Sequence, residues 1–169
     1  ESMPCPARRL PVLFRNALWR ALLPALRVLF ALGMLSPAGA VDRIGVNEAR
    51  QQALAGAITL IDIRRPEEWQ ASGIADVAIE IDMRAPDFLD RVRQLQLAHK
   101  DRPLAFICAT GGRSDRLARW FEHQGVKPVI DVSAGMHGRN GWLAGKLPTR
   151  APGTKPVAPT ASQAANSAN

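Results

Sequence analysis

The chain has 169 residues and a formal net charge of +7 at pH 7, with 22 lysines and arginines against 15 acidic residues. This length suffices for one domain with a buried core, and no internal repeat indicates a second. Residues 1–40 carry +4 of the charge, which leaves +3 for the rest. Such a small excess, without basic residues interleaved with aromatic ones, argues against nucleic acid as a partner.

The first 40 residues have the pattern of a secretory signal peptide. Basic residues including Arg8 and Arg9 precede the apolar stretch VLFALGML, and small residues suited to cleavage follow at Ala38–Ala40. The uncharged run of residues 28–41 is 14 residues long. Spanning a bilayer takes about 20 apolar residues. We therefore expect cleavage after Ala40 and export to the periplasm. The alternative is that the segment is retained and targets the chain to a membrane. In that case the chain would contact the membrane only through this segment.

The opposite end of the chain, residues 151–169, is rich in Pro, Ala, Ser, Thr and Asn, and Val157 is its only large apolar residue. Such a segment buries too little surface to offset the entropy of ordering, so we expect disorder from residue 151 onward. The folded domain is thus predicted over residues 42–150. Cys108 is the only cysteine in that domain, so it has no partner there for a disulfide.

Helix and strand patterns alternate along this predicted domain. In chain order they are a helix at 46–57, strands at 58–63 and 78–83, a helix at 86–98, a strand at 104–108, a helix at 115–125 and a strand at 128–132. The strands are short and almost continuously apolar, as in sheets covered on both faces, and the helices are amphipathic, the first with Asn47 as its expected N-cap. This alternation indicates an α/β fold with a mostly parallel sheet between helices, in which ligands bind at the carboxyl ends of the strands.

The segment CATGGRS, residues 108–114, places Cys108 at the end of a predicted strand and the start of a glycine loop. Gly111 and Gly112 allow positive φ, so that the backbone can turn its N–H groups inward as an anion-binding nest. A helix beginning near Ser114 and the cation of Arg113 add positive charge, and all these features favour a nucleophilic thiolate. Each feature alone has a structural explanation, such as a tight turn, a helix cap or an inert buried thiol; their combination favours a functional site.

The spacing C-x-x-G-x-R-S in this loop resembles the active-site loop of the rhodanese sulfurtransferases. Two further motifs resemble that family in the same order, IDIRRPEEWQASGI at 61–74 and VSAGMHGRNGWLAGKLP at 132–148. The resemblance covers about residues 44–148 and implies a single rhodanese-like domain, a three-layer sandwich with a mostly parallel five-stranded central sheet flanked by helices. The chain departs from the family at Ala75 and Val77, where Pro and Gly are usual, and at Ala109, where a basic residue is common and its absence weakens the expected affinity for thiosulfate.

The resemblance implies a two-step reaction of the thiosulfate sulfurtransferase type. Cys108 would take a sulfane sulfur from a small donor such as thiosulfate, and an acceptor such as cyanide or a thiol would remove it. The residues implied to hold the persulfide anion are Ala109, Thr110, Gly111, Gly112, Arg113 and Ser114. The resemblance also implies that no metal or organic cofactor is needed. The three histidines, for their part, lack the spacing of metal ligands. We expect a monomer that meets small sulfur compounds and, in addition, a protein thiol partner.

Two alternatives follow from the same loop. A module that carries or senses a persulfide for a protein partner without turnover would have the same residues, and the sequence leaves it open. Phosphatases and arsenate reductases also use a cysteine, an anion nest and an arginine, but their loop has one more residue between the two side chains. Only four residues separate Cys108 from Arg113. One residue fewer shortens the ring by about 3.5 Å of contour, which favours a single sulfur over a tetrahedral oxyanion.

Overall fold

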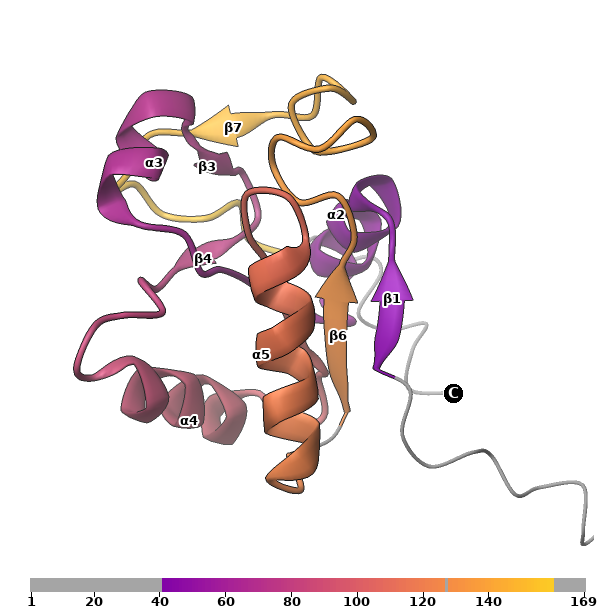
Figure 1. The fold of residues 1–169 in the computed structure, drawn as a ribbon, viewed down its shortest axis with the longest axis vertical. Helices are drawn as coiled ribbons and strands as arrows, with labels where there is room; N and C mark the ends of the chain where they lie inside the picture. The colour runs from indigo at the N-terminus through magenta and orange to yellow at the C-terminus, as the bar shows by residue number, and fades with distance from the viewer. Residues whose placement is uncertain (1–40, 127, 160–169) are drawn as a thin grey trace, which may run out of the picture. The chain divides into compact units, whose positions relative to one another are not determined.

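A computed structural model describes residues 41–126 and 128–159 (Figure 1). In chain order its elements are β1 (Asp42–Ile44), α2 (Val46–Leu54), β2 (Thr59–Asp62), α3 (Pro66–Ser72), β3 (Ile74–Ala75), β4 (Ile79–Glu80), α4 (Phe88–Ala98), β5 (Leu104–Ile107), α5 (Gly112–His123), β6 (Val129–Val132) and β7 (Thr149–Arg150). The expected signal segment, residues 1–40, lies outside the described residues. No helix within the described ranges has the length and apolarity needed to cross a bilayer.

Five parallel strands form the central sheet in the order β1-β6-β5-β2-β4. The central strand is β5, in which Leu104 lies opposite Thr59 of β2 and Val129 of β6. Parallel neighbours require crossover connections, and the helices supply them. The prediction of an α/β fold with a parallel five-stranded sheet is confirmed. All four strands expected from apolar runs are present, and the fifth, β1, is only three residues long and largely exposed.

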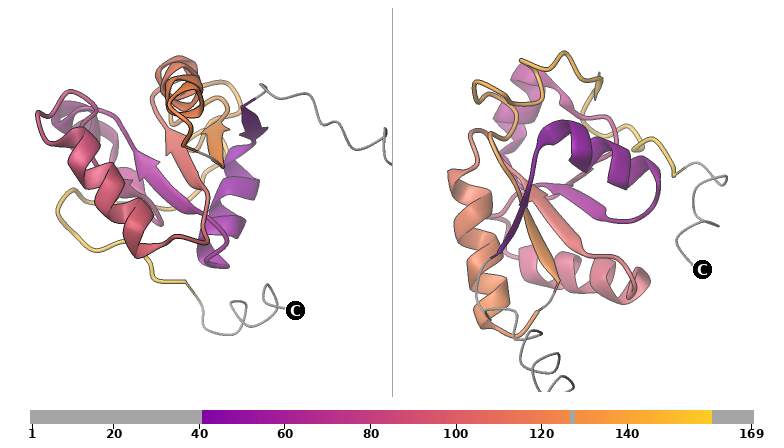
Figure 2. Two further views of the ribbon diagram at one scale, coloured as in Figure 1. Left: turned by 90° about the horizontal axis from the view of Figure 1, so that it is seen from below. Right: turned by 90° about the vertical axis from the view of Figure 1, so that its right-hand side faces the viewer.

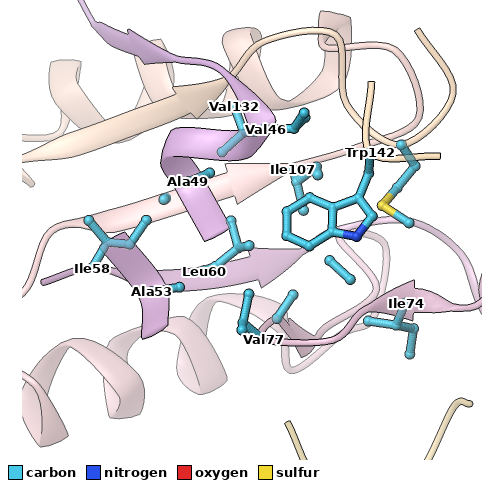
Figure 3. Close-up of a cluster of buried hydrophobic side chains, with 14 of the residues drawn as sticks. Val46, Ala49, Ala53, Ile58, Leu60, Ile74, Val77, Ile107, Val132 and Trp142 are labelled. Carbon is cyan, nitrogen blue, oxygen red and sulfur yellow. The ribbon is translucent and has the colours of Figure 1, made fainter. Parts of the chain in front are cut away.

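The sheet is covered on both faces, which makes the three layers of the fold (Figure 2). On one face α2 and the segment around Trp142 pack against alternate strand residues such as Leu60 and Ile107 (Figure 3). On the other face α4 and α5 cover the residues between them, and Phe121 of α5 stacks on Phe106 with ring centroids 5.3 Å apart. Strand residues therefore alternate between two apolar clusters, which accounts for their continuous apolarity in the sequence.

Two helices begin at residues other than those expected. The first, α2, begins at Val46 with Gly45 as its N-cap, so Asn47 lies inside the first turn instead of capping it. The helix after the cysteine loop, α5, begins at Gly112, two residues before Ser114, and its N-cap is Gly111. A glycine at each N-cap leaves the first N–H groups without a side-chain acceptor.

Residues 151–159, the described part of the tail for which the sequence predicts disorder, are hydrogen-bonded to the domain. The preceding strand, β7, pairs antiparallel with β3, and the chain then runs on along the domain. Gly153 N–H donates to a Glu80 carboxylate oxygen over 3.0 Å, and Val157 N–H donates to Asp76 O over 2.9 Å. Hydrogen bonds from the backbone thus hold a segment whose side chains offer little apolar surface. Residues 160–169 lie outside the described part.

Candidate functional site

Cys108 follows β5 directly, at the carboxyl end of the central strand, and is only 1% exposed. The strand ends here because the carbonyl groups of the next two residues accept hydrogen bonds from the segment after β6 and not from a neighbouring strand. Cys108 O accepts a hydrogen bond from Met136 N–H over 2.8 Å, and Ala109 O accepts one from His137 N–H over 2.7 Å. The Gly-rich segment after β6 therefore supports the backbone that carries the cysteine.

Gly135 makes this close support possible. Its φ of +56° lies in the left-handed region, and a Cβ built there would lie 2.3 Å from Cys108 O and 2.8 Å from Ala109 O. No side chain larger than hydrogen fits in that space. The sequence motif included Gly135, but its role beneath the cysteine loop follows only from the fold.

Two groups of the loop donate hydrogen bonds toward the thiol sulfur, and the Arg113 side chain interacts with it as well. Gly111 N–H points at Sγ over 3.2 Å, and Ser114 Oγ lies 3.4 Å from it. Gly111 has a φ of +93°, which turns its N–H back toward the sulfur. Gly112 does not share this conformation, because it begins α5, so the expectation of positive φ is correct for Gly111 alone. Ala109, half-buried, and Thr110, exposed, complete the loop.

Arg113 is not an unpaired cation beside the sulfur, as the sequence suggested. Its guanidinium group forms a two-pronged ion pair with Glu68 of α3, with N–O distances of 2.9 and 2.6 Å. This hydrogen bonding lowers the pKa of Glu68 to about 2 and raises the pKa of Arg113. The charge of Cys108 contributes to the rise at Arg113, though less than Glu68 does, so the guanidinium group is also electrostatically coupled to the sulfur. The carboxylate therefore compensates much of the positive charge expected at the site.

Asp62 and Arg64 hold α3, and with it Glu68, in place. Both side chains are fully buried, and Arg64 binds the Asp62 carboxylate with N–O distances of 2.8 to 3.1 Å. Arg64 also donates to Ser72 Oγ over 2.8 Å and to Gly73 O over 2.6 Å at the end of α3. A buried charge with all these partners fixes the helix relative to β2, which confirms that this pair braces loops.

The remaining aromatic and histidine residues of the motifs have structural positions. Trp69 and Trp142 are buried, and the indole N–H of Trp142 donates to Pro148 O over 2.8 Å. This confirms them as packing anchors. His137 has an exposed side chain. Within residues 41–126 and 128–159, no group of three or more His, Cys, Asp or Glu side chains could hold a metal ion.

Comparison with known proteins places this cysteine loop in a family, because the family model of the rhodanese-like domain matches residues 46–141. The chain belongs to the rhodanese-like family. A putative sulfurtransferase of Bacillus subtilis is 34% identical to this rhodanese-like chain over 77 residues, which are 46% of this chain and 68% of that protein. The chloroplast protein THYLAKOID RHODANESE-LIKE of Oryza sativa is 30% identical over 102 residues, 55% of this chain. The match spans only 21% of that longer relative.

A solved structure agrees with the rhodanese-like fold. The polysulfide-sulfur transferase homodimer of Wolinella succinogenes aligns with a TM-score of 0.53 at 24% identity, over 67% of this chain and 80% of that one. At this identity the likeness concerns the fold. The family match, together with the sulfurtransferase among the relatives, supports a sulfurtransferase family.

Proposed function

We propose that this chain transfers sulfane sulfur through a persulfide on Cys108. The observation that carries the proposal is the convergence of Gly111 N–H and Ser114 Oγ on Sγ, at 3.2 and 3.4 Å. An anionic sulfur accepts hydrogen bonds, and donors fixed before the reaction stabilise charge without reorganisation. The start of α5 adds its positive partial charge next to the same loop.

The reaction has two balanced steps. In the first, the Cys108 thiolate attacks the sulfane sulfur of the donor, a new S–S bond forms, and the donor's bond to that sulfur breaks; with thiosulfate, sulfite leaves with the electron pair. In the second, an acceptor thiolate or cyanide attacks the outer sulfur, and the Cys108 thiolate leaves. The loop amides from Ala109 to Arg113, together with the Ser114 hydroxyl, would hold the persulfide between the steps.

The ion pair of Arg113 bears on the choice of donor. Thiosulfate is a dianion, and Glu68 offsets the cation that would attract it. Ala109 adds no charge at a position where relatives often have a basic residue. We therefore propose that thiosulfate is a weak donor and that a sulfur donor of lower charge serves this site better.

A persulfide carrier is the second candidate function, and the burial of Cys108 favours it. The Cys108 residue is only 1% exposed, and such burial protects a bound sulfur from acceptors in solution, as a carrier requires. The phosphatase alternative has less support, because the ring between Cys108 and Arg113 is short for a tetrahedral oxyanion.

Steady-state kinetics distinguish the two leading candidates. Continuous production of thiocyanate from a sulfane donor and cyanide supports an enzyme, whereas one equivalent of bound sulfur without turnover supports a carrier. The matched control is the Cys108→Ser variant, which should neither bind nor transfer sulfur. Hydrolysis of a phosphate ester that depends on Cys108 would favour the phosphatase alternative.

Export of the chain and its monomeric state are further proposals. The first rests on the sequence of residues 1–40 alone. The mass of the protein purified from its host would show whether the chain has been cleaved after Ala40, and a retained segment would instead support attachment to the membrane.

A further inference from the structure

A cavity of about 300 Å³ lies at the end of the central sheet opposite the cysteine loop. Thr59, which lines it, is in register with Leu104 at the start of β5, whereas Cys108 follows the end of that strand. The edge strand β4 pairs only with Ile61 and Asp62, so the first two residues of β2 have no strand partner on this side. The cavity occupies the space beside them.

The walls of the cavity come from the apolar core and from the chain after β7. Leu60 and Val77, which belong to the apolar cluster beneath α2, line one part of it. Residues 155–159 line another part, and the hydrogen bond from Val157 N–H to Asp76 O, 2.9 Å long, ties this segment to the domain. The cavity is therefore largely apolar, and it exists only because the chain after β7 lies along the domain.

Three basic side chains, those of His99, Arg102 and Lys155, also line the cavity, and no acidic residue of the described ranges does. None of the three forms an ion pair or a side-chain hydrogen bond within the part of the chain that the structure describes. Arg102 is half-buried, and a Cβ built on Gly56 would lie 3.3 Å from its Nη2 atom and 3.4 Å from Pro159 Cβ. A half-buried cation without a counter-ion favours the binding of an anion.

The acidic residues near the cavity in the chain do not compensate this charge. Asp76 binds Arg50 with an N–O distance of 2.7 Å, and Glu80 forms an ion pair with Arg150. Asp101 is exposed and does not pair with the guanidinium group in the cavity. The positive charge of the cavity is therefore available to a ligand.

The hydroxyl group of Thr59 is an independent indication of a polar ligand. Thr59 lines the cavity and is 6% exposed, and its Oγ1 atom has no hydrogen-bond partner among the described residues. A buried hydroxyl group without a partner is costly. An oxygen atom of a bound ligand could accept its hydrogen bond and remove that cost.

We propose that this cavity binds a small organic anion, a carboxylate with an apolar body. The fork of N–H groups on Arg102 suits the two oxygens of a carboxylate, and Lys155 adds a second positive charge. The apolar body would pack against Leu60 and Val77. A volume of about 300 Å³ has room for roughly ten non-hydrogen atoms. The site is separate from Cys108 and goes beyond the proposed sulfur transfer.

The test is an amide NMR titration of the full chain with octanoate, a carboxylate of this size. Octanoate should shift the amide signals of Thr59, Arg102 and Val157 and saturate them with a single affinity. Octanol, which has the same apolar chain without the charge, should bind more weakly by roughly fivefold or more. Shifts confined to other parts of the chain, or equal affinities for the two compounds, would overturn the proposal.

Charge variants identify the groups that hold the carboxylate. Arg102→Gln should weaken octanoate binding by roughly fivefold and leave octanol binding unchanged. The matched control is Arg93→Gln, which removes the same charge from an exposed position on α4 outside the cavity and should bind as the parent does. Lys155→Gln should also weaken octanoate binding, and it keeps the test valid if Arg102→Gln does not fold.

Parent affinity for octanoate in both cavity variants, or the same loss in the Arg93→Gln control, would overturn the proposal. The Cys108→Ser variant should bind octanoate as tightly as the parent, because the cysteine lies at the other end of the sheet. The titration uses no sulfur donor, so its result is independent of whether the chain transfers sulfur.

Discussion

The replacement Gly135→Ala tests how the cysteine loop is supported. The new Cβ would lie 2.3 Å from Cys108 O and 2.8 Å from the carbonyl carbon and oxygen of Ala109. These are backbone atoms, so no side-chain rotation can relieve the contact. The loop would have to move away from the segment after β6, and the hydrogen bonds from Met136 and His137 N–H would lengthen or break.

The cost can be worked from three contributions. An alanine in the left-handed region costs roughly 1–2 kcal/mol, and overpacking of a tight site costs roughly 1–3 kcal/mol. Each weakened hydrogen bond costs about 1 kcal/mol. Movement of the loop relieves the overpacking but weakens these hydrogen bonds, so the contributions do not all apply in full. We expect Gly135→Ala to lower the free energy of unfolding by about 3–5 kcal/mol, a large part of the roughly 5–15 kcal/mol available to a domain.

Gly125→Ala provides the matched control for this prediction. Gly125 also has a positive φ, +79°, but a Cβ there would meet no atom within 4 Å. The Gly125→Ala variant should lose only the conformational contribution, about 1–2 kcal/mol of its free energy of unfolding. Urea unfolding of both variants measures the difference. Equal losses in the two variants would refute the argument that close contact with Cys108 O, and not φ alone, requires glycine at 135.

Three further variants test the charged groups around the site. Glu68→Gln should lower the free energy of unfolding by about 2 kcal/mol at pH 7. This difference from the parent should fade as the pH drops from 4.5 toward 2, because the pKa of Glu68 in the folded protein, about 2, lies below its ordinary value of 4.5. Urea unfolding at pH 7 and pH 2 measures the difference, and one that persists at pH 2 would contradict the prediction. Asp62→Asn should cost about 3–5 kcal/mol, since it leaves the Arg64 charge buried without its partner; a thermal unfolding temperature close to the parent's would argue against that. Arg113→Ala should weaken transfer from anionic donors more than from neutral ones in initial-rate assays, and equal losses would count against a role in donor binding.

Local patterns in the sequence were sufficient to predict the central sheet. Strands buried on both faces are apolar at nearly every position, as at 104–107, and Gly at the N-cap and Arg in the first turn mark the loop after β5. Family resemblance added the fifth strand. Its three residues, Asp42–Ile44, are mostly exposed and pair only at the sheet edge, so their own pattern does not distinguish them from a loop.

Contacts between distant residues could not be predicted in this way. Glu68 and Arg113 are 45 residues apart, and only the packing of α3 against the loop brings their charges together. Asp131 is the one acidic residue in the apolar run VIDV, and only the packing of α5 against β6 relates this strand to the helix that follows the cysteine loop. The order of residues 151–159 likewise depends on carboxylate and carbonyl groups of the β3–β4 region.

The most direct test of the account is the intact mass of the Cys5→Ser protein after exposure to a sulfane sulfur donor and removal of the excess. We expect a gain of one sulfur atom, which a thiol acceptor reverses and which is absent when Cys108 is also replaced by serine. An unchanged mass with every donor, or the same gain without Cys108, would contradict the persulfide at this position.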